Sequence, residues 1–162
     1  MISRRRATHL IISALAIFGS LATDWAGSRV GAAARQNSRT APGAVLSVWD
    51  GVYTEEQSKR GERLYAASCT MCHAAELTGG QVVPALVGED ILNKWNGAMA
   101  GEIFEQIRQT MPQDNPGSLT PAQSADLLAF IFRKNKFPEG KDELGTEFEA
   151  LNAIRIEPTK KR

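Results

Sequence analysis

The segment Cys69-Thr-Met-Cys72-His73 carries most of the chemical information in this sequence. It contains both cysteines of the 162-residue chain and one of its two histidines. The two thiols are three positions apart, and an imidazole directly follows the second thiol. Two cysteines are too few for a disulfide scaffold, and two histidines are too few for most metal sites. The spacing of these three groups is therefore more informative than their number.

This C-x-x-C-H pattern is the attachment signature of a c-type haem. At the end of a helix, two thiols at this spacing can add to the two vinyl groups on one edge of a porphyrin. The imidazole of the next residue then reaches the iron from the same side. We therefore predict one haem c, bound covalently by Cys69 and Cys72, with His73 as an axial ligand of its iron.

Three other uses of these residues are less consistent with the sequence. A thioredoxin-like dithiol is expected close to a βαβ pattern, and the sequence has no strand signal. A structural zinc site needs four Cys or His ligands, whereas this pentapeptide offers three. A disulfide between Cys69 and Cys72 would leave the surrounding loops without a core.

Residues 1–34 are predicted to be a targeting segment. Arg4–Arg6 form a positive n-region, and an apolar run over residues 10–22 is followed by small residues, which is the layout of a secretory signal peptide. Cleavage after Ala22 or after Ala34 fits this layout. The run is shorter than the roughly 18 to 20 residues of a spanning helix, so an uncleaved membrane anchor is the minor alternative. We therefore expect a periplasmic protein.

The composition excludes several classes of protein. The chain is 43% hydrophobic, 23% charged and 7% aromatic, which is ordinary for a globular domain and unlike fibrous, disordered or polytopic membrane proteins. Its 19 basic and 18 acidic residues give no charge excess that would favour nucleic acid. Removal of residues 1–34 takes away four arginines and one aspartate, which leaves 15 basic and 17 acidic residues.

Capping signals and apolar periodicity predict three helices. The segments Thr54–Gln57 and Thr120–Gln123 have the pattern of capping boxes, in which the hydroxyl and the Gln side chain satisfy free backbone donors reciprocally. The predicted helices run from Thr54 to about Ser68, from Ala100 to Gln109, and from Thr120 to before Pro138. The segment 74–93 is expected to be irregular. Long loops in a compact domain indicate that another group fills the core.

These features predict an all-α domain of three to four short helices and long loops around one covalent haem. We assign residues 35–52 to a linker, 53–137 to the domain and 138–162 to a C-terminal tail packed on it. Around Trp49, an apolar patch could dock a partner, but packing onto the domain is the favoured interpretation. Scattered apolar residues are expected to hold the tail on the surface; they are Leu144, Phe148, Leu151, Ile154 and Ile156.

From about Thr54 to Asn135 the sequence resembles class I monohaem cytochromes c of the bacterial type, which implies the cytochrome c fold. The resemblance extends beyond the pentapeptide to Gly61-x-x-Leu-Tyr65, Pro84-Ala-Leu86 and Met111-Pro112. It implies that the terminal helices cross at Gly61, against Leu127, Phe130 and Ile131. It also implies that the Pro84 carbonyl accepts a hydrogen bond from the ring of the haem-ligating histidine, and that Trp95 lies near a haem propionate.

Met111 is the preferred sixth ligand of the iron. Met1 is removed with the signal peptide, and Met71 lies inside the attachment segment, on the same side of the porphyrin as the histidine. Met99, near the start of a helix, is interpreted as a core residue. Met111 follows that helix in a loop stiffened by Pro112. An open sixth site, or a different sixth ligand, is the remaining alternative.

A haem with both axial positions filled has no free iron site for a substrate, so we expect one-electron transfer rather than catalysis. The segment 47–53 and the long tail resemble extensions of cytochromes that serve periplasmic quinoprotein dehydrogenases. This resemblance implies a quinoprotein dehydrogenase as donor and a terminal oxidase as eventual acceptor. We expect the protein itself to be a monomer. The alternatives are a five-coordinate haem sensor or peroxidase-like enzyme, and a cytochrome subunit of a larger oxidoreductase complex.

Overall fold

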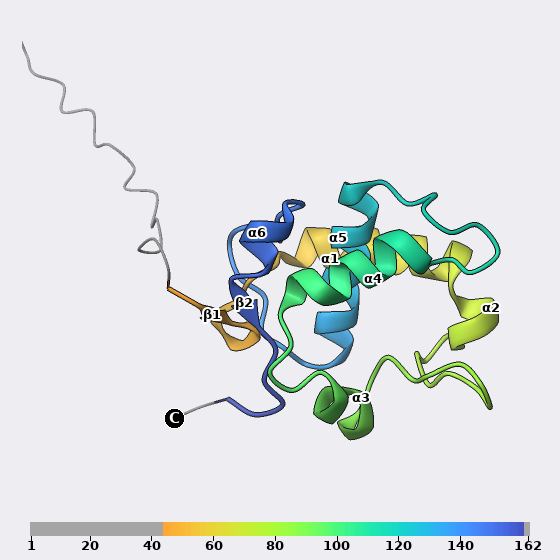
Figure 1. Cartoon of the computed structure of the whole chain (residues 1–162), viewed down its shortest axis with the longest axis horizontal. Coiled ribbons are helices and arrows are strands. Elements are labelled where there is room, and N and C mark those ends of the chain that lie inside the picture. Colours follow the sequence, from red (N-terminus) through yellow and green to blue (C-terminus); the bar gives the residue numbers. More distant parts are fainter. Residues whose placement is uncertain (1–43, 161–162) are drawn as a thin grey trace, which may run out of the picture. The chain divides into compact units, whose positions relative to one another are not determined.

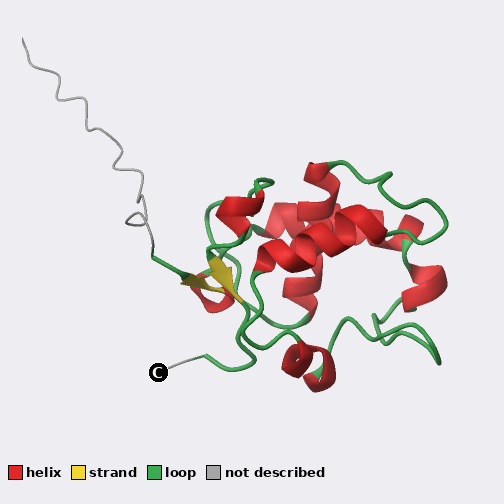
Figure 2. Cartoon of the chain, viewed as in Figure 1, coloured by secondary structure: helices red, strands yellow, loops and turns green. Residues whose placement is uncertain are grey.

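The computed structural model describes residues 44–160. The predicted signal peptide, residues 1–34, lies outside this range. The described residues are mostly helical (Figures 1 and 2). In chain order the elements are β1 (Leu46–Ser47), η1 (Val48–Asp50, a 3-10 helix), α1 (Glu55–Ser68), α2 (Thr70–His73), α3 (Glu89–Lys94), α4 (Ala100–Thr110), α5 (Pro121–Lys134), α6 (Phe148–Leu151) and β2 (Ile154–Arg155).

The three helices that the sequence predicts are present as α1, α4 and α5. The described residues also form three further short α-helices, α2, α3 and α6. The total of α-helices is therefore larger than the three to four that the sequence predicts. Five of the six residues of helix α3 lie in the segment 74–93, so the expectation of a wholly irregular segment is wrong. It has six residues, and the Gly88 before it provides no side-chain cap. A helix this short has neither an apolar period nor a capping residue by which sequence could reveal it.

One of the two expected capping boxes is complete. At α5, the Thr120 hydroxyl accepts from the Gln123 amide, and the Gln123 side chain accepts from the Thr120 amide. At α1, the Thr54 hydroxyl accepts from the Gln57 amide at 3.1 Å, but the Gln57 side chain turns elsewhere. Its amide binds both backbone groups of Leu144, at 2.9 and 2.7 Å. The predicted box at α1 is therefore only half formed, because its buried amide holds the tail.

Helices α1 and α5 share the most extensive helix–helix interface within residues 44–160. They meet at Gly61, where a β-carbon would overlap the Asp126 carbonyl and lie 2.9 Å from Cβ of Phe130. One turn further along α1, the Tyr65 ring packs against the Phe130 ring with centroids 5.2 Å apart. This close crossing holds α1 against α5, and the Cys69–His73 segment directly follows the last residue of α1.

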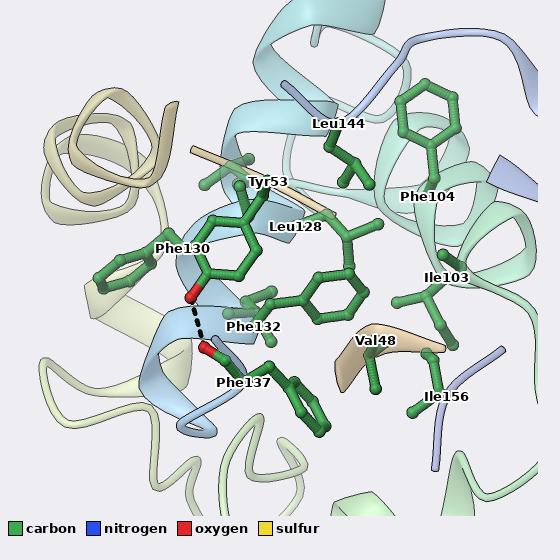
Figure 3. Packing of buried hydrophobic residues seen from close by; sticks show 14 of the residues in the cluster. Val48, Tyr53, Ile103, Phe104, Leu128, Phe130, Phe132, Phe137, Leu144 and Ile156 are labelled. Atoms are coloured by element: carbon green, nitrogen blue, oxygen red, sulfur yellow. Dashed lines mark hydrogen bonds between the residues drawn. The ribbon is translucent and has the colours of Figure 1, made fainter. Parts of the chain in front are cut away.

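The core brings the N-terminal extension and the tail together around α5 (Figure 3). Val48 and Tyr53 are buried beside Phe132, and the Tyr53 hydroxyl donates to the Phe137 carbonyl at 2.6 Å. The Phe137 ring makes edge contacts with Trp49 and Phe132, at 5.0 and 5.7 Å between centroids. Trp49 also donates its indole N–H to a tail carbonyl. The interpretation of Trp49 as a packing residue is therefore confirmed.

One expectation about the chain ends is wrong. The sequence shows no strand signal, yet β1 pairs in parallel with β2, with Leu46 opposite Ile154. The five apolar tail residues were expected to hold the tail on the domain, and Leu144, Leu151, Ile154 and Ile156 are buried in its core. Two-residue strands have no detectable period, and the tail becomes core only because β1 and α4 cover it. Of those tail residues, Phe148 is 41% exposed.

No helix among residues 44–160 is both long enough and apolar enough to cross a membrane.

Candidate haem site

The Cys69–His73 segment forms a tight turn at the C-terminal end of α1. The Cys69 amide donates to the Tyr65 carbonyl at 2.9 Å, and the His73 amide donates to the Cys69 carbonyl at 2.9 Å. The Tyr65 hydroxyl reaches past the segment and donates to the Ala74 carbonyl at 2.7 Å. These bonds fix both ends of the pentapeptide on one helix, so the two thiols and the imidazole are presented as a unit.

Both cysteines have free thiols that differ in exposure. Cys69 is half-buried against the core and Cys72 is exposed. Burial, with a smaller contribution from the charge of Cys72, raises the pKa of Cys69 to about 11. The Cys69 thiol is therefore protonated at neutral pH. Because Cys72 is exposed, a porphyrin edge attached to it would lie at the surface of the protein.

His73 is buried, with 8% of its surface exposed, and its Nδ1 atom lies 3.2 Å from the Pro84 carbonyl oxygen. A carbonyl can only accept a hydrogen bond, so this contact requires the proton to be on Nδ1. The Nε2 atom of the neutral ring then carries the lone pair, which is the form that binds a metal ion. A carbonyl in this position also increases the electron donation of the ring to a bound metal ion.

The loop after His73 folds back on itself to bring Pro84 to the imidazole. The Gly79 amide donates to the His73 carbonyl at 3.0 Å, and the Gly80 amide donates to the Val83 carbonyl at 2.8 Å. Gly79 has a φ of +68°, which favours glycine, and its backbone packs closely against the Pro84 peptide. This glycine therefore permits both the turn and the close approach.

The structure adds Asn135, a residue that the sequence analysis did not single out. It is buried at the C-terminal end of α5, and its side chain binds the loop that contains Pro84. Its amide nitrogen donates to the Leu86 carbonyl at 2.8 Å, and its amide oxygen accepts from the Gly88 amide at 3.2 Å. An asparagine after a helix is common in any sequence, so no local signal distinguished this one.

The methionines differ in their surroundings. Met111 directly follows α4, is half-buried, and donates its backbone N–H to the Ile107 carbonyl at 3.0 Å; its peptide bond to Pro112 is cis. Met99 is also half-buried, but its backbone pairs with Arg155 in the tail. Met71 is 97% exposed. The loop after α4 lies at the same end of the described residues as α2 and the 74–88 loop (Figure 1).

Trp95 is buried at the end of α3, with its backbone N–H bound to the Ile91 carbonyl and its carbonyl bound to the Ala98 amide, both at 2.9 Å. Of the predicted site residues, the structure brings His73 and Pro84 into contact. Among the polar contacts of residues 44–160, none joins Met111 or Trp95 to His73.

The donor set fits a porphyrin-bound iron better than a metal ion held by protein ligands alone. Within the described residues, no group of three or more His, Cys, Asp or Glu side chains is arranged to hold a metal ion. The donors available among the described residues are one imidazole and the thioethers of Met71, Met99 and Met111, beside two thiols at the vinyl spacing. Several aliphatic side chains from the flanking helices and loops pack on the core yet stay only partly buried, as expected where a flat apolar group adds to it; they are Leu64, Leu86, Val87, Leu92, Ile107 and Leu119.

Comparison with known proteins agrees with this geometry. Residues 56–131 match the family described as cytochrome c oxidase, cbb3-type, subunit III. Residues 56–131 therefore correspond to a class I c-type cytochrome domain with the cytochrome c fold, and a domain of this kind implies haem c with its iron.

Among solved structures, the chain is similar to the sulfane dehydrogenase SoxCD from Paracoccus pantotrophus, at 18% identity and a TM-score of 0.45. The match covers 70% of this chain, and the chain spans 60% of the length of that one. No curated protein matches the chain significantly.

Proposed function

We propose that this protein is a periplasmic electron carrier that holds one haem c covalently on Cys69 and Cys72, with His73 and Met111 as axial ligands. The observation that carries the proposal is the buried His73, with Nδ1 on a carbonyl, directly after two free thiols at a helix end. A bound haem would supply a one-electron couple between Fe(II) and Fe(III). The matched cytochrome family supports the electron-transfer role.

Each residue has a distinct part in this proposal. Cys69 and Cys72 tether the porphyrin to the end of α1. His73 binds the iron through Nε2, and the Pro84 carbonyl holds the ring in the tautomer that leaves Nε2 free. Trp95, which is buried directly after α3, would contact a haem propionate.

Met111 is the proposed sixth ligand because of its position in the fold. It ends α4, is half-buried, and lies in a loop at the same end of the described residues as α2 (Figure 1). Met99 is committed to the tail through its backbone pairing, and Met71 points into solvent. A thioether ligand raises the reduction potential of a haem relative to harder ligands.

The location and the domain bounds are part of the same proposal. Residues 1–34 would be removed during export, and residues 53–137 would form the cytochrome domain. The tail from residue 138 packs on this domain, as the buried Leu151 and Ile156 support. We expect a monomer that forms short-lived, salt-dependent complexes with its redox partners.

A quinoprotein dehydrogenase is the proposed electron donor, and a terminal oxidase the eventual acceptor. This assignment derives from the resemblance of the two extensions. Addition of a purified periplasmic quinoprotein dehydrogenase with its substrate should reduce the cytochrome faster than the substrate alone. An unchanged rate would refute this partner and leave the carrier role intact.

Absorption spectra of the exported protein, oxidised and reduced, test the axial pair. We expect the weak red band of Met–Fe(III) ligation in the wild type and in Met99→Ala, and its loss in Met111→Ala. Met99→Ala is the matched control because it removes an equally half-buried methionine. A wild-type protein that lacks the band and binds carbon monoxide readily would indicate an open iron site and a sensor or enzyme. Stable co-purification with a larger oxidoreductase would indicate a subunit rather than a free carrier.

A further inference from the structure

The clasp between Asn135 and the 84–88 segment links the end of α5 to the histidine's carbonyl partner. Asn135 uses both ends of its amide there, since Nδ2 donates to the Leu86 carbonyl at 2.8 Å and Oδ1 accepts from the Gly88 amide at 3.2 Å. The second hydrogen of Nδ2 goes to the Ile131 carbonyl at 2.9 Å. The buried side chain therefore forms three hydrogen bonds. Two of them hold Leu86 and Gly88, which follow Pro84 closely in the chain.

The position of Asn135 is fixed by the C-terminal cap of α5. The loop that Asn135 binds is therefore held in a defined position relative to α5. The residue after it, Lys136, has a φ of +66°, and the Phe137 amide donates to the Phe132 carbonyl at 3.1 Å. This is the bonding pattern of a Schellman cap, which ends a helix at a defined residue. The Phe137 ring then packs against the Phe132 ring in the core.

On its other side the Pro84 peptide lies against the backbone that leaves the histidine. A β-carbon at Gly79 would lie 2.6 Å from the carbonyl carbon of Pro84. Leu86 closes the loop further, because its amide donates to the Leu77 carbonyl at 2.8 Å. The Pro84 carbonyl is thus confined between the Gly79 turn and the Asn135 clasp.

From this arrangement we propose that Asn135 is a positioning residue for the axial histidine: it fixes the Pro84 carbonyl at the Nδ1–H of His73. This inference rests on the proposed role of His73 as the iron ligand. Without the clasp the Pro84 carbonyl moves more freely and accepts a weaker hydrogen bond. His73 then becomes a poorer electron donor, the oxidised iron is less stabilised, and the reduction potential rises.

The test compares two buried amides that each hold a distant loop. Asn135→Leu removes the clasp with little change in volume and none in charge. Gln57→Leu is the matched control, because Gln57 is buried and binds the Leu144 backbone through two bonds. Both variants are measured as haem proteins by redox titration, by urea unfolding, and by NMR hydrogen exchange of the His73 ring N–H.

Both variants are expected to lose stability, but only Asn135→Leu shifts the potential. At a fixed electrode potential its ratio of oxidised to reduced protein should fall about threefold, the size expected when part of one hydrogen bond is lost. Exchange of the His73 ring N–H should become faster in this variant alone. If Asn135→Leu does not accumulate, Asn135→Ser keeps one hydroxyl for bonding, and its potential should shift in the same direction.

An unchanged potential in the Asn135 variants, beside a wild type with a histidine-ligated haem, would overturn this inference alone. An equal shift in Gln57→Leu would also overturn it, because the effect would then be general loosening of the fold. A wild-type protein without a histidine-ligated haem would instead overturn the proposed function, and this inference with it.

Discussion

Replacement of Gly61 by alanine tests the close crossing of α1 and α5. The added β-carbon would overlap the Asp126 carbonyl oxygen and lie 2.5 Å from its carbon. Ordinary contact between carbon atoms begins at about 3.5 Å, so the helices must separate by about 1 Å. A backbone carbonyl cannot rotate away as a flexible side chain can, and the strain must therefore move a whole helix.

The magnitude follows from two opposing effects. Overpacking of a core contact costs about 1 to 3 kcal/mol, and occasionally more when backbone atoms are involved. Alanine in a helix interior contributes about 1 kcal/mol relative to glycine, which offsets part of the loss. Because the clash is with a backbone carbonyl, we take the upper end of that cost, about 3 kcal/mol. After the offset we expect Gly61→Ala to lower the free energy of unfolding by about 2 kcal/mol, a large share of the stability of a small domain.

Gly101→Ala in α4 is the matched control. It gains the same helix propensity, but its β-carbon would approach the nearest atoms of α6 only to 3.1 Å. Its stability should stay within about 1 kcal/mol of the wild type. Urea unfolding of the haem-bound wild type, Gly61→Ala and Gly101→Ala provides the measurement. The slope of the unfolding free energy against urea concentration is compared among these three proteins. If Gly61→Ala is as stable as Gly101→Ala, the helices can separate without cost and the reasoning about the crossing is wrong.

Three further predictions concern the tail and the pH dependence of stability. Gln57→Ala leaves both backbone groups of Leu144 unpaired and should cost about 2 to 3 kcal/mol, with faster proteolytic cleavage of the tail than in the wild type. Burial raises the pKa of Tyr53 from 10.0 to about 12, so above pH 10 the unfolded chain releases a proton that the folded chain keeps. Stability should therefore fall as the pH rises from 10 to 12, and Tyr53→Phe should reduce that fall in urea titrations; an equal fall in both proteins would contradict the assignment. Hydrogen bonds from Arg60 lower the pKa of Glu143 from 4.5, so this pair stabilises the fold above pH 4.5 and is lost as the pH falls through the lowered value. The effect is small because Glu143 is half exposed, and Glu143→Gln should make the acid limb of the stability curve slightly less steep, whereas an unchanged acid limb would contradict it.

The long helices of this protein could be predicted because their signals are local. Thr120 and Gln123 cap α5 with bonds between residues three positions apart, and the boundaries of α4 follow from its apolar spacing and the proline after it. The predicted crossing at Gly61 also appears in the structure, with Phe130 as one of the expected partners. For the helices, a short stretch of sequence contains the groups that make the contact, whereas the crossing joins distant residues and was implied by the family resemblance.

The prediction failed at α1 because one side chain could bind either a neighbour in sequence or a distant residue. Gln57 fits the third position of a capping box, yet its amide binds Leu144, which is 87 residues away. The alternative bonds are to backbone groups that would otherwise be buried without partners, and leaving them unpaired costs more than an incomplete cap at a solvent-exposed helix end. The sequence near Thr54 does not indicate that the Gln57 amide binds Leu144 instead of the end of α1.

By itself, the sequence predicts the haem attachment chemistry that we propose for this protein. The order and spacing of Cys69, Cys72 and His73 are covalent facts of the chain, and thiol and imidazole chemistry limits what such a segment can bind. The composition and the capping signals placed that segment at the end of a helix in an all-α domain.

Only the tertiary structure decided what surrounds the histidine and what completes the core. The clasp from Asn135 joins residues 49 positions apart at Leu86, and the hydrogen bond between Ser47 and Glu157 spans 110 positions. Polar groups in such places pair because the fold buries them together, away from water, and an unpaired buried group is costly. No residue near Asn135 in sequence indicates its partners, so the contact exists only once α1 and α5 have crossed.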